Sequence, residues 1–256
     1  MGAAGLGMTA AVQDAVTLTG RSLRRSTREL DTLLLSVLLP AMLMLLFVQV
    51  FGGALDPSGQ YVDYVVPGVL LLCAGYGAAQ TAVGVAADTT EGFVRRLRTM
   101  PVSASAVLTG HVVASLARNA VATLAVVGVA LALGFRPTAT PAQWLAAAGL
   151  LALFVTAVTW VSVAIGLVAG SVEAASGYTF VVLFLPYLSS AFVPVGTMPT
   201  ALQRFAEHQP VTPVIETLRA LLLGTPGGDP VLAVGWCAGV LAVAVPVAAA
   251  LFRRTG

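Results

Sequence analysis

The chain has 256 residues, of which 58% are hydrophobic and only 9% are charged, and its mean hydropathy is +0.93. A soluble domain carries about 25% charged residues, so this composition excludes water as the main solvent and indicates a membrane protein. The net charge of +2 is too small to argue for nucleic acid as a partner. Cys73 and Cys237 each lie in an apolar run, which favours buried small side chains over a disulfide or a metal site.

Residues 1–31 precede the apolar stretches and are predicted to form a cytoplasmic amphipathic helix on the membrane surface. Between Val12 and Leu30 this segment mixes apolar side chains with four arginines, which we expect to face lipid phosphates. The apolar run that follows is about twice as long as the core of a signal peptide and has no small-residue cleavage motif. We therefore expect it to stay attached as the first span.

Six stretches free of ionisable side chains are long enough to cross a membrane as helices, which takes about 20 residues. They predict an all-α transmembrane domain over residues 32–256 with spans at about 33–54, 64–87, 107–134, 144–169, 174–193 and 230–252. Residues 137–143 read as a turn ahead of the fourth span, and the fifth helix is expected to break after Phe192. Pro40 and Pro186 are expected to kink their spans, either as packing features or as gating hinges.

The arginines orient these spans, because cytoplasmic loops collect positive charge. With the N-terminus inside, the cytoplasmic side holds Arg21, Arg24, Arg25, Arg28, Arg95, Arg96, Arg98, Arg253 and Arg254. The outside holds Arg136, Arg204 and Arg219. Both termini are therefore predicted to be cytoplasmic, with the chain in the cell membrane. The absence of lysine and the abundance of Ala, Val, Gly and Arg are typical of a GC-rich bacterial genome. Arg118 lies in the third span, where it either snorkels to the inner boundary or lines a path.

A basic strip, EGFVRRLRTMPVSAS at residues 91–105, separates the second and third spans. On a helix, Phe93 and Leu97 share one face and the arginines occupy the others, which predicts a short amphipathic helix on the cytoplasmic surface. These residues alone leave two functions open: fixing the topology, or docking a soluble partner through apolar anchors and basic rim contacts. The docking residues would be Glu91, Gly92, Phe93, Arg95, Arg96, Leu97, Arg98 and Pro101.

The segment after the fifth span is expected to form two short re-entrant helices in the outer leaflet. Thr212 and Pro213 fit an N-cap and first-turn pair. An apolar stripe follows and comprises Val214, Ile215, Leu218, Leu221 and Leu222. Glu216 and Arg219 are three residues apart and can pair on the helix surface, and we interpret them as a structural clasp rather than a substrate contact.

Two parts of the chain resemble ABC-2 type transporter permeases, most closely their drug-resistance branch with the daunorubicin-type exporters. The first consists of Glu91-Gly92, Arg96-Leu97, Thr99-Met100-Pro101-Val102-Ser103 and Gly110-His111, with Phe93 where the family commonly has threonine and His111 where it has lysine. The second consists of Phe192-Val193-Pro194, Met198-Pro199, Leu202, Ala206, Gln209-Pro210, Thr212, Glu216 and Arg219. There, Gln209 replaces the asparagine of an Asn-Pro pair.

This resemblance implies the permease subunit of an ATP-driven exporter of amphipathic drug-like or lipid-like cargo. It also implies a second permease half and two copies of an ABC ATPase that dock on the basic strip. A Walker-type phosphate loop requires a lysine and this sequence has none, so ATP and Mg²⁺ are expected on the partner ATPase. Candidates for a substrate path, or for core packing, are Tyr76, Gln80, Tyr178, Phe184 and Tyr187.

No enzyme is predicted, because His111 and His208 fall on opposite sides of the membrane and assemble no catalytic or metal site. The alternative function is a secondary transporter or channel that runs on an ion gradient. Such proteins usually place ionisable groups inside their spans as relays, and the predicted spans are nearly bare of them. A membrane scaffold without transport activity also stays open.

Overall fold

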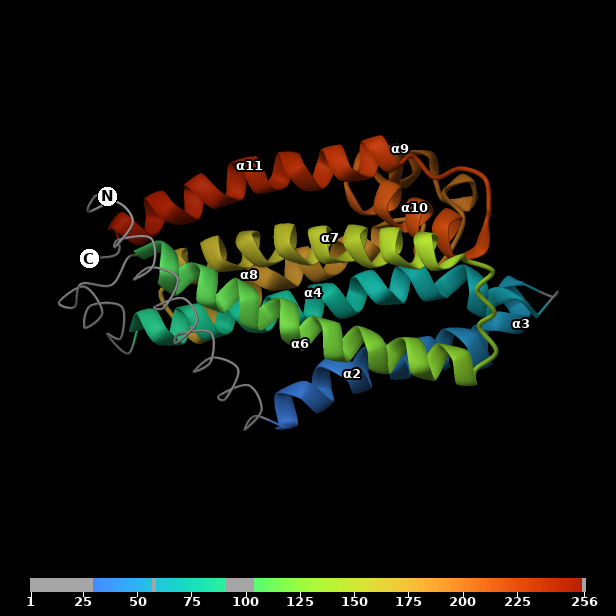
Figure 1. Ribbon diagram of the computed structural model, residues 1–256, viewed down its shortest axis with the longest axis horizontal. Helices are drawn as coiled ribbons and strands as arrows, with labels where there is room; N and C mark the ends of the chain where they lie inside the picture. The colour runs from blue at the N-terminus through green and yellow to red at the C-terminus, as the bar shows by residue number, and fades with distance from the viewer. Residues whose placement is uncertain (1–29, 57–58, 91–103, 255–256) are drawn as a thin grey trace, which may run out of the picture.

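The computed structural model describes residues 30–56, 59–90 and 104–254. Across these ranges the chain forms helices and no strand, and the long helices lie side by side in one elongated bundle (Figure 1). Five helical segments are long and apolar enough to cross a membrane: Ser36–Leu55, Tyr61–Thr90, Leu108–Ala132, Pro141–Val168 and Pro230–Arg254. The prediction of an all-helical multi-pass membrane protein is confirmed at this level. The amphipathic helix predicted within residues 1–31 lies almost wholly outside the described part, which begins at Leu30 with α2.

The first apolar segment forms one continuous helical run that includes Pro40. Helix α2 (Leu30–Leu45) contains Pro40 and passes directly into a π-helical turn, η1 (Leu46–Phe51), and then into α3 (Gly52–Leu55). A π turn inserts a residue into the helical ladder and changes the direction of the side chains beyond it. The C-terminal end of this segment therefore presents Phe51 and its neighbours on a different face from that of an uninterrupted α-helix.

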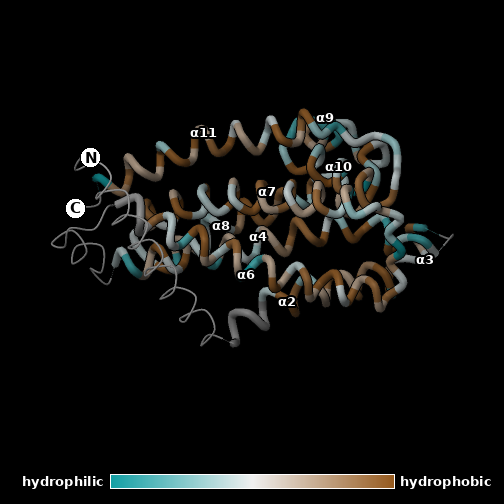
Figure 2. The backbone as a smooth tube through the Cα atoms, viewed as in Figure 1, coloured by the Kyte–Doolittle hydropathy of each residue, from teal (hydrophilic) through white to brown (hydrophobic). Residues whose placement is uncertain are grey.

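Helix α4 (Tyr61–Thr90) lies at the centre of the bundle and is longer at both ends than predicted. It packs against α2, α6 (Ala104–Ala132), α7 (Pro141–Val168) and α8 (Val172–Phe184). In the most apolar stretch of α4, 72% of the residues are buried inside the bundle. In the corresponding stretches of the first and last spans, only 22% are buried. Figure 2 shows that hydrophobic residues dominate the long helices and that hydrophilic ones gather toward their ends. The core is therefore built around α4, with the first and last spans at its periphery.

Helix α7 begins at Pro141, so the predicted turn at 137–143 is partly wrong. Thr140 is its N-cap: its side chain accepts a hydrogen bond from the Gln143 backbone N–H, while the Gln143 side chain accepts one from the Thr140 N–H. This capping box, with proline at the first helical position, starts a helix rather than ending a loop. Later in the same helix, Gly166 touches α4, where a β-carbon would lie 2.8 Å from the Val85 Cβ.

The helix of the predicted fifth span ends at Phe184, not after Phe192. The 13 residues of α8 are followed by a four-residue 3-10 turn, η2 (Leu185–Leu188). Pro186 explains the early end, because proline has no N–H to donate and its ring collides with the carbonyl one turn earlier. The run Val172–Leu188 is apolar but shorter than the five segments that meet the length of a membrane span.

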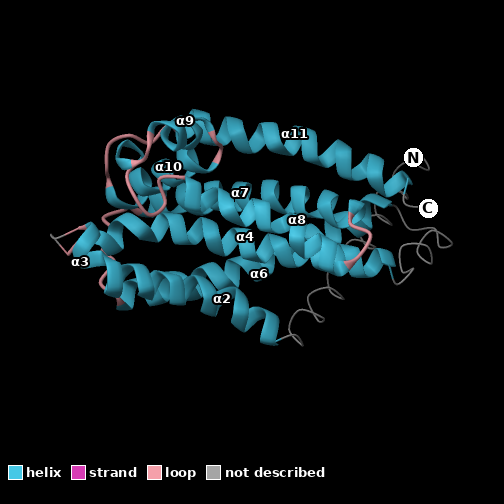
Figure 3. Cartoon of the chain, turned by 180° about the vertical axis from the view of Figure 1, so that it is seen from behind, coloured by secondary structure: helices cyan, strands magenta, loops and turns pink. Residues whose placement is uncertain are grey.

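Two short helices follow the fifth apolar run, as predicted, and pack at one end of the bundle. They are α9 (Thr200–His208) and α10 (Val211–Leu223), preceded by the turn η3 (Val195–Thr197). The view from behind places most of the loops at this end as well (Figure 3). The apolar stripe of α10 is confirmed: Val214, Ile215, Leu218 and Leu222 are buried and Leu221 is partly buried.

The predicted N-cap of α10 is wrong, because the helix begins at Val211 and Thr212 lies inside its first turn. The Gln209 side chain satisfies this helix end instead. Its Oε1 accepts a hydrogen bond from the Val211 N–H at 3.2 Å, and its Nε2 donates to the Thr212 Oγ1 at 3.1 Å. The chain then returns through the last helix, α11 (Pro230–Arg254), which packs mainly on α7.

Candidate transport path and outer clasp

The predicted docking residues, from Glu91 to Pro101, lie outside the described residues, so their role stays a prediction. The helices on either side of them are described, and a contact between a histidine and a carboxylate joins the two. His111 Nε2 on α6 lies 3.2 Å from Asp88 Oδ2 on α4. The end of α4, the start of α6 and the end of α11 lie at one end of the bundle, opposite α9 and α10 (Figure 1).

A set of polar side chains crosses the interior between α4, α6 and α7. Arg118 Nη2 donates to the Thr81 hydroxyl at 3.1 Å, so this arginine has a partner inside the bundle. The hydroxyls of Ser115 and Thr159 lie 3.1 Å apart, and Asn119 Nδ2 donates to the Ser115 carbonyl at 3.0 Å. The sequence analysis does not anticipate the Ser115–Thr159 contact, which joins positions 44 residues apart on α6 and α7.

Close by lies a polar pocket of about 10 Å³ lined by Ser36, Gly77, Gln80, Arg118, Asn119 and Ala122. This volume suits about one water molecule. The Oδ1 atom of Asn119 is buried and has no hydrogen-bond partner among the described residues. Gly77 leaves the room for the amide, because a β-carbon at that position would collide with the Asn119 side chain. Gln80 is exposed at the edge of this pocket.

The structure brings together three of the five residues predicted for the path. The rings of Phe184 and Tyr187 lie 5.9 Å apart, and Tyr76 lies close enough to Tyr187 to interact with it electrostatically. Gln80 follows Tyr76 by one helical turn on α4, so it extends the same face toward the polar pocket. Tyr178 is separate: six residues before Phe184 at about 100° per residue, it points to another side of α8, where it is 56% exposed.

An aromatic row continues from this group across neighbouring helices and turns. Neighbouring ring centroids along it are 4.3 to 5.9 Å apart, within the range of favourable aromatic pairs. In order, the rings belong to Phe180, Phe184, Tyr187, Phe192, Phe47 and Phe51. The sequence gives no signal for this row, because its members come from η1, α8, η2 and the following loop. It lies on the side of α4 that faces α2 and α8.

Arg219 is the centre of the outer clasp, although its hydrogen bonds differ from those predicted. Its Nη2 donates to the backbone carbonyls of Tyr64 at 2.9 Å and Ser190 at 3.0 Å, and its guanidinium lies 3.9 Å from the centre of the Tyr64 ring. No ion pair joins it to Glu216 in the described part of the chain, and its buried Nε has no partner there. Burial raises the pKa of the Glu216 carboxyl, which the nearby Arg219 charge opposes.

Two tyrosines of α4 strengthen the same junction from the other side. The Tyr61 hydroxyl donates to the Phe192 carbonyl at 2.7 Å, and the Tyr64 hydroxyl donates to the Ser190 carbonyl at 2.9 Å. The loop after η2 is therefore held to α4 and α10 by hydrogen bonds to its backbone carbonyls. Such contacts depend on where the backbone lies and not on which side chains the loop carries.

Comparison with known proteins agrees with this architecture. The model of the ABC-2 type transporter family matches residues 13–223. The daunorubicin resistance ABC transporter permease protein DrrB1 of Streptomyces coeruleorubidus is 32% identical over 221 residues, which cover 85% of this chain and 78% of that protein. The probable doxorubicin resistance ABC transporter permease protein DrrC of Mycobacterium tuberculosis is 27% identical over 239 residues, which cover 90% of this chain and 85% of that protein. The chain therefore belongs to the ABC-2 type transporter family and is the permease subunit of an ABC transporter, whose ATPase is a separate chain.

Proposed function

We propose that this permease exports amphipathic drug-like or lipid-like cargo, with energy delivered by the ATPase through the basic strip at residues 91–101. The drug-resistance names of both relatives support this class of cargo. ATP and Mg²⁺ belong to the partner in this proposal, since the sequence has no lysine for a Walker-type loop. Two ATPase copies and a second permease half, identical or related, complete the transporter.

The proposed cargo path runs along the face of α4 that carries Tyr76 and Gln80. The exposure of the Gln80 side chain is the observation that supports this assignment. Its side chain is exposed in the middle of a helix that otherwise suits a membrane. An amide in contact with lipid tails would lose its hydrogen bonds with water at a cost of roughly 2–7 kcal/mol. This face is therefore better suited to a second permease half and a hydrated path than to lipid. The aromatic row beside it offers stacking surfaces to planar cargo.

The topology that accompanies this proposal has six spans, with α8 and η2 as the short fifth one. Both termini and the basic strip face the cytoplasm of a bacterial cell, as the placement of the arginines favours. In support, the ends of α4 and α11 and the start of α6 share one end of the bundle (Figure 1). Helices α9 and α10 then lie at the outer end.

Docking is tested by changing Arg95, Arg96 and Arg98 together to glutamate. We expect the ATPase to be lost from the purified complex while membrane insertion is unchanged, because like charges would then face the partner. The matched control is Arg204→Glu on α9, which is exposed at the opposite end. Retention of the ATPase with normal stimulation of its activity would reject docking at the strip.

The path is tested by Gln80→Leu in inverted vesicles that contain the permease and its ATPase. We expect slower ATP-dependent uptake of daunorubicin, with Gln203→Leu on α9 as the control. Gln203 is on the outer segment, where its amide bonds to Glu207. Equal uptake by both variants and the unaltered protein would reject this face as the path. Uptake that needs no ATPase and follows a proton gradient would instead support the secondary transporter.

A further inference from the structure

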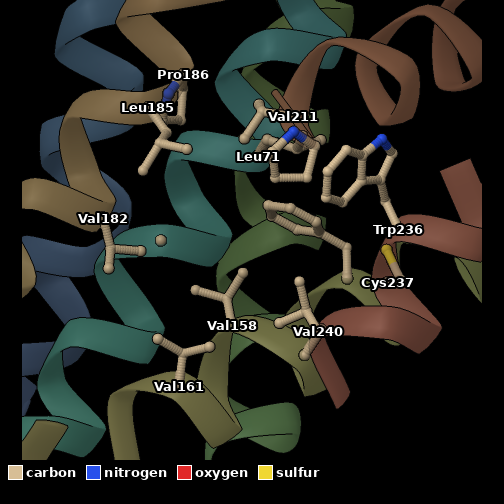
Figure 4. A pocket seen from close by; sticks show the side chains of 14 residues that line it. Leu71, Val158, Val161, Val182, Leu185, Pro186, Val211, Trp236, Cys237 and Val240 are labelled. Atoms are coloured by element: carbon tan, nitrogen blue, oxygen red, sulfur yellow. The ribbon is translucent and has the colours of Figure 1, made fainter. Parts of the chain in front are cut away.

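A cavity of about 150 Å³ lies on the side of α4 away from Gln80. Figure 4 shows Val182 and Leu185 on one wall and Trp236 and Val240 of α11 on the other, with α4 and α7 behind them. Pro210 and Val211, at the start of α10, also line it. Leu71 and Gln80 are nine residues apart on α4, which places them on opposite faces at about 100° per residue. The cavity is therefore distinct from the proposed cargo path.

The chemistry of the lining restricts what can occupy the cavity. Aliphatic side chains, the Phe154 ring and prolines dominate it, and no charged residue is among the lining residues. The Trp236 indole and the Cys237 thiol are the exceptions, and both are weak anchors compared with a charge or an amide. Apolar cavities of about this size in proteins stay dry and take up small hydrocarbons. Water and charged drugs are poor ligands here, and a hydrocarbon chain is a good one.

The surroundings of the cavity indicate where such a chain comes from. On one side, Val181 of α8 is 69% exposed; on the other, Trp236 is 38% exposed and Val243 of α11 is 64% exposed. These surfaces belong to helices that lie in the hydrocarbon of a membrane, so lipid tails cover them. The tail of a neighbouring lipid would reach the cavity between α8 and α11 without crossing any polar surface.

We propose that this cavity binds the acyl chain of a membrane phospholipid, inserted laterally between α8 and α11. The acyl chain fills the space over α7 and contacts η2 and the start of α10. The bound lipid therefore touches the short helical run and the outer segment that Arg219 ties to α4. This proposal rests on the six-span topology proposed above, which places α8 in the membrane, and is independent of the cargo and of the docking strip.

The test uses the purified full-length permease in phosphatidylcholine vesicles that contain a small share of phosphatidylcholine with a photoactivatable diazirine on one acyl chain. After illumination, labelled peptides are identified by mass spectrometry. We expect labelling of the peptides that hold Val182 and Trp236. Ala157→Phe and Val240→Phe should each reduce this labelling severalfold, because the added ring occupies space that the acyl chain would fill. Val243→Phe, on the exposed face of α11, should leave it unchanged.

Two results would overturn the proposal. The first is labelling that neither cavity-filling variant reduces, which would mean that the probe reports ordinary lipid contact at the surface. The second is displacement of the label by excess daunorubicin, which would assign the cavity to cargo instead of lipid. A cooperative thermal unfolding transition in each variant serves as the control for correct folding. The two filling variants lie on different helices, so a folding defect in one leaves the other as a test. No ATPase is present, so failure here leaves the transport proposal untouched.

Discussion

Removing the guanidinium of Arg219 is the sharpest test of how the outer segment is held. Arg219→Ala removes two hydrogen bonds from a charged donor, to the carbonyls of Tyr64 and Ser190, and its contact with the Tyr64 ring. Hydrogen bonds to charged groups contribute about 1.5–3 kcal/mol each and a partly buried cation–π contact about 1 kcal/mol. Relief of the cost of burying the charge offsets part of this sum. We expect the free energy of unfolding to fall by about 3 kcal/mol.

The measurement is reversible denaturation in detergent micelles, with Arg204→Ala as the control. Arg204 is an exposed arginine of the neighbouring helix α9, so its loss is expected to cost less than about 0.5 kcal/mol. Arg219→Lys should fall between the two, because a compact ammonium cannot reproduce the fork of the guanidinium. Glu216→Gln should cost less than about 1 kcal/mol, since the structure shows no direct ion pair with Arg219. If Glu216→Gln destabilises the protein as much as Arg219→Ala does, the ion pair and not the backbone carbonyls holds the segment.

Three further predictions concern the contacts inside the bundle, and each is measured by the same denaturation assay. Gly166→Ala should lower the free energy of unfolding by about 1–3 kcal/mol, because the added β-carbon would press on α4. Gly170→Ala is the control, because its β-carbon meets open space and should change the stability little. Equal effects of the two substitutions would contradict this packing. Gly77→Ala should destabilise the protein through collision with the amide of Asn119, and the double variant with Asn119→Ala should recover part of the loss; additive effects would refute the collision. His111→Ala should cost about 1 kcal/mol by removing the contact between the His111 ring and the Asp88 carboxylate, and an unchanged stability would show that this contact contributes nothing.

Most of the helical plan follows from the sequence, because long apolar runs have one stable form in a membrane. The errors lie at helix ends, where a few local contacts decide. Pro141 was assigned to a turn, although Thr140 and Gln143 had the spacing of a capping box. The fifth helix was predicted too long, although Pro186 already gave the physical reason for an earlier end.

The site was less predictable than the fold because its contacts join distant positions. The sequence identified Arg219 as part of a clasp, but spacing along a helix favours a neighbour such as Glu216 over a backbone carbonyl 155 residues away. Tyr76 and Tyr187 were placed on a common path, and they do lie together. Their neighbours Phe47 and Phe192 went unnoticed, since only the folded chain brings the aromatic row into one line.

The unequal burial of the helices has a consequence for how this protein can diverge. Substitutions in α4 meet neighbours on nearly every side, so few changes of volume are accommodated there. The first span and α11 expose most of their surface to lipid, where one aliphatic residue replaces another at little cost. Orthologues should therefore differ most along these two peripheral helices, and laboratory selection for altered specificity should draw its tolerated changes from them.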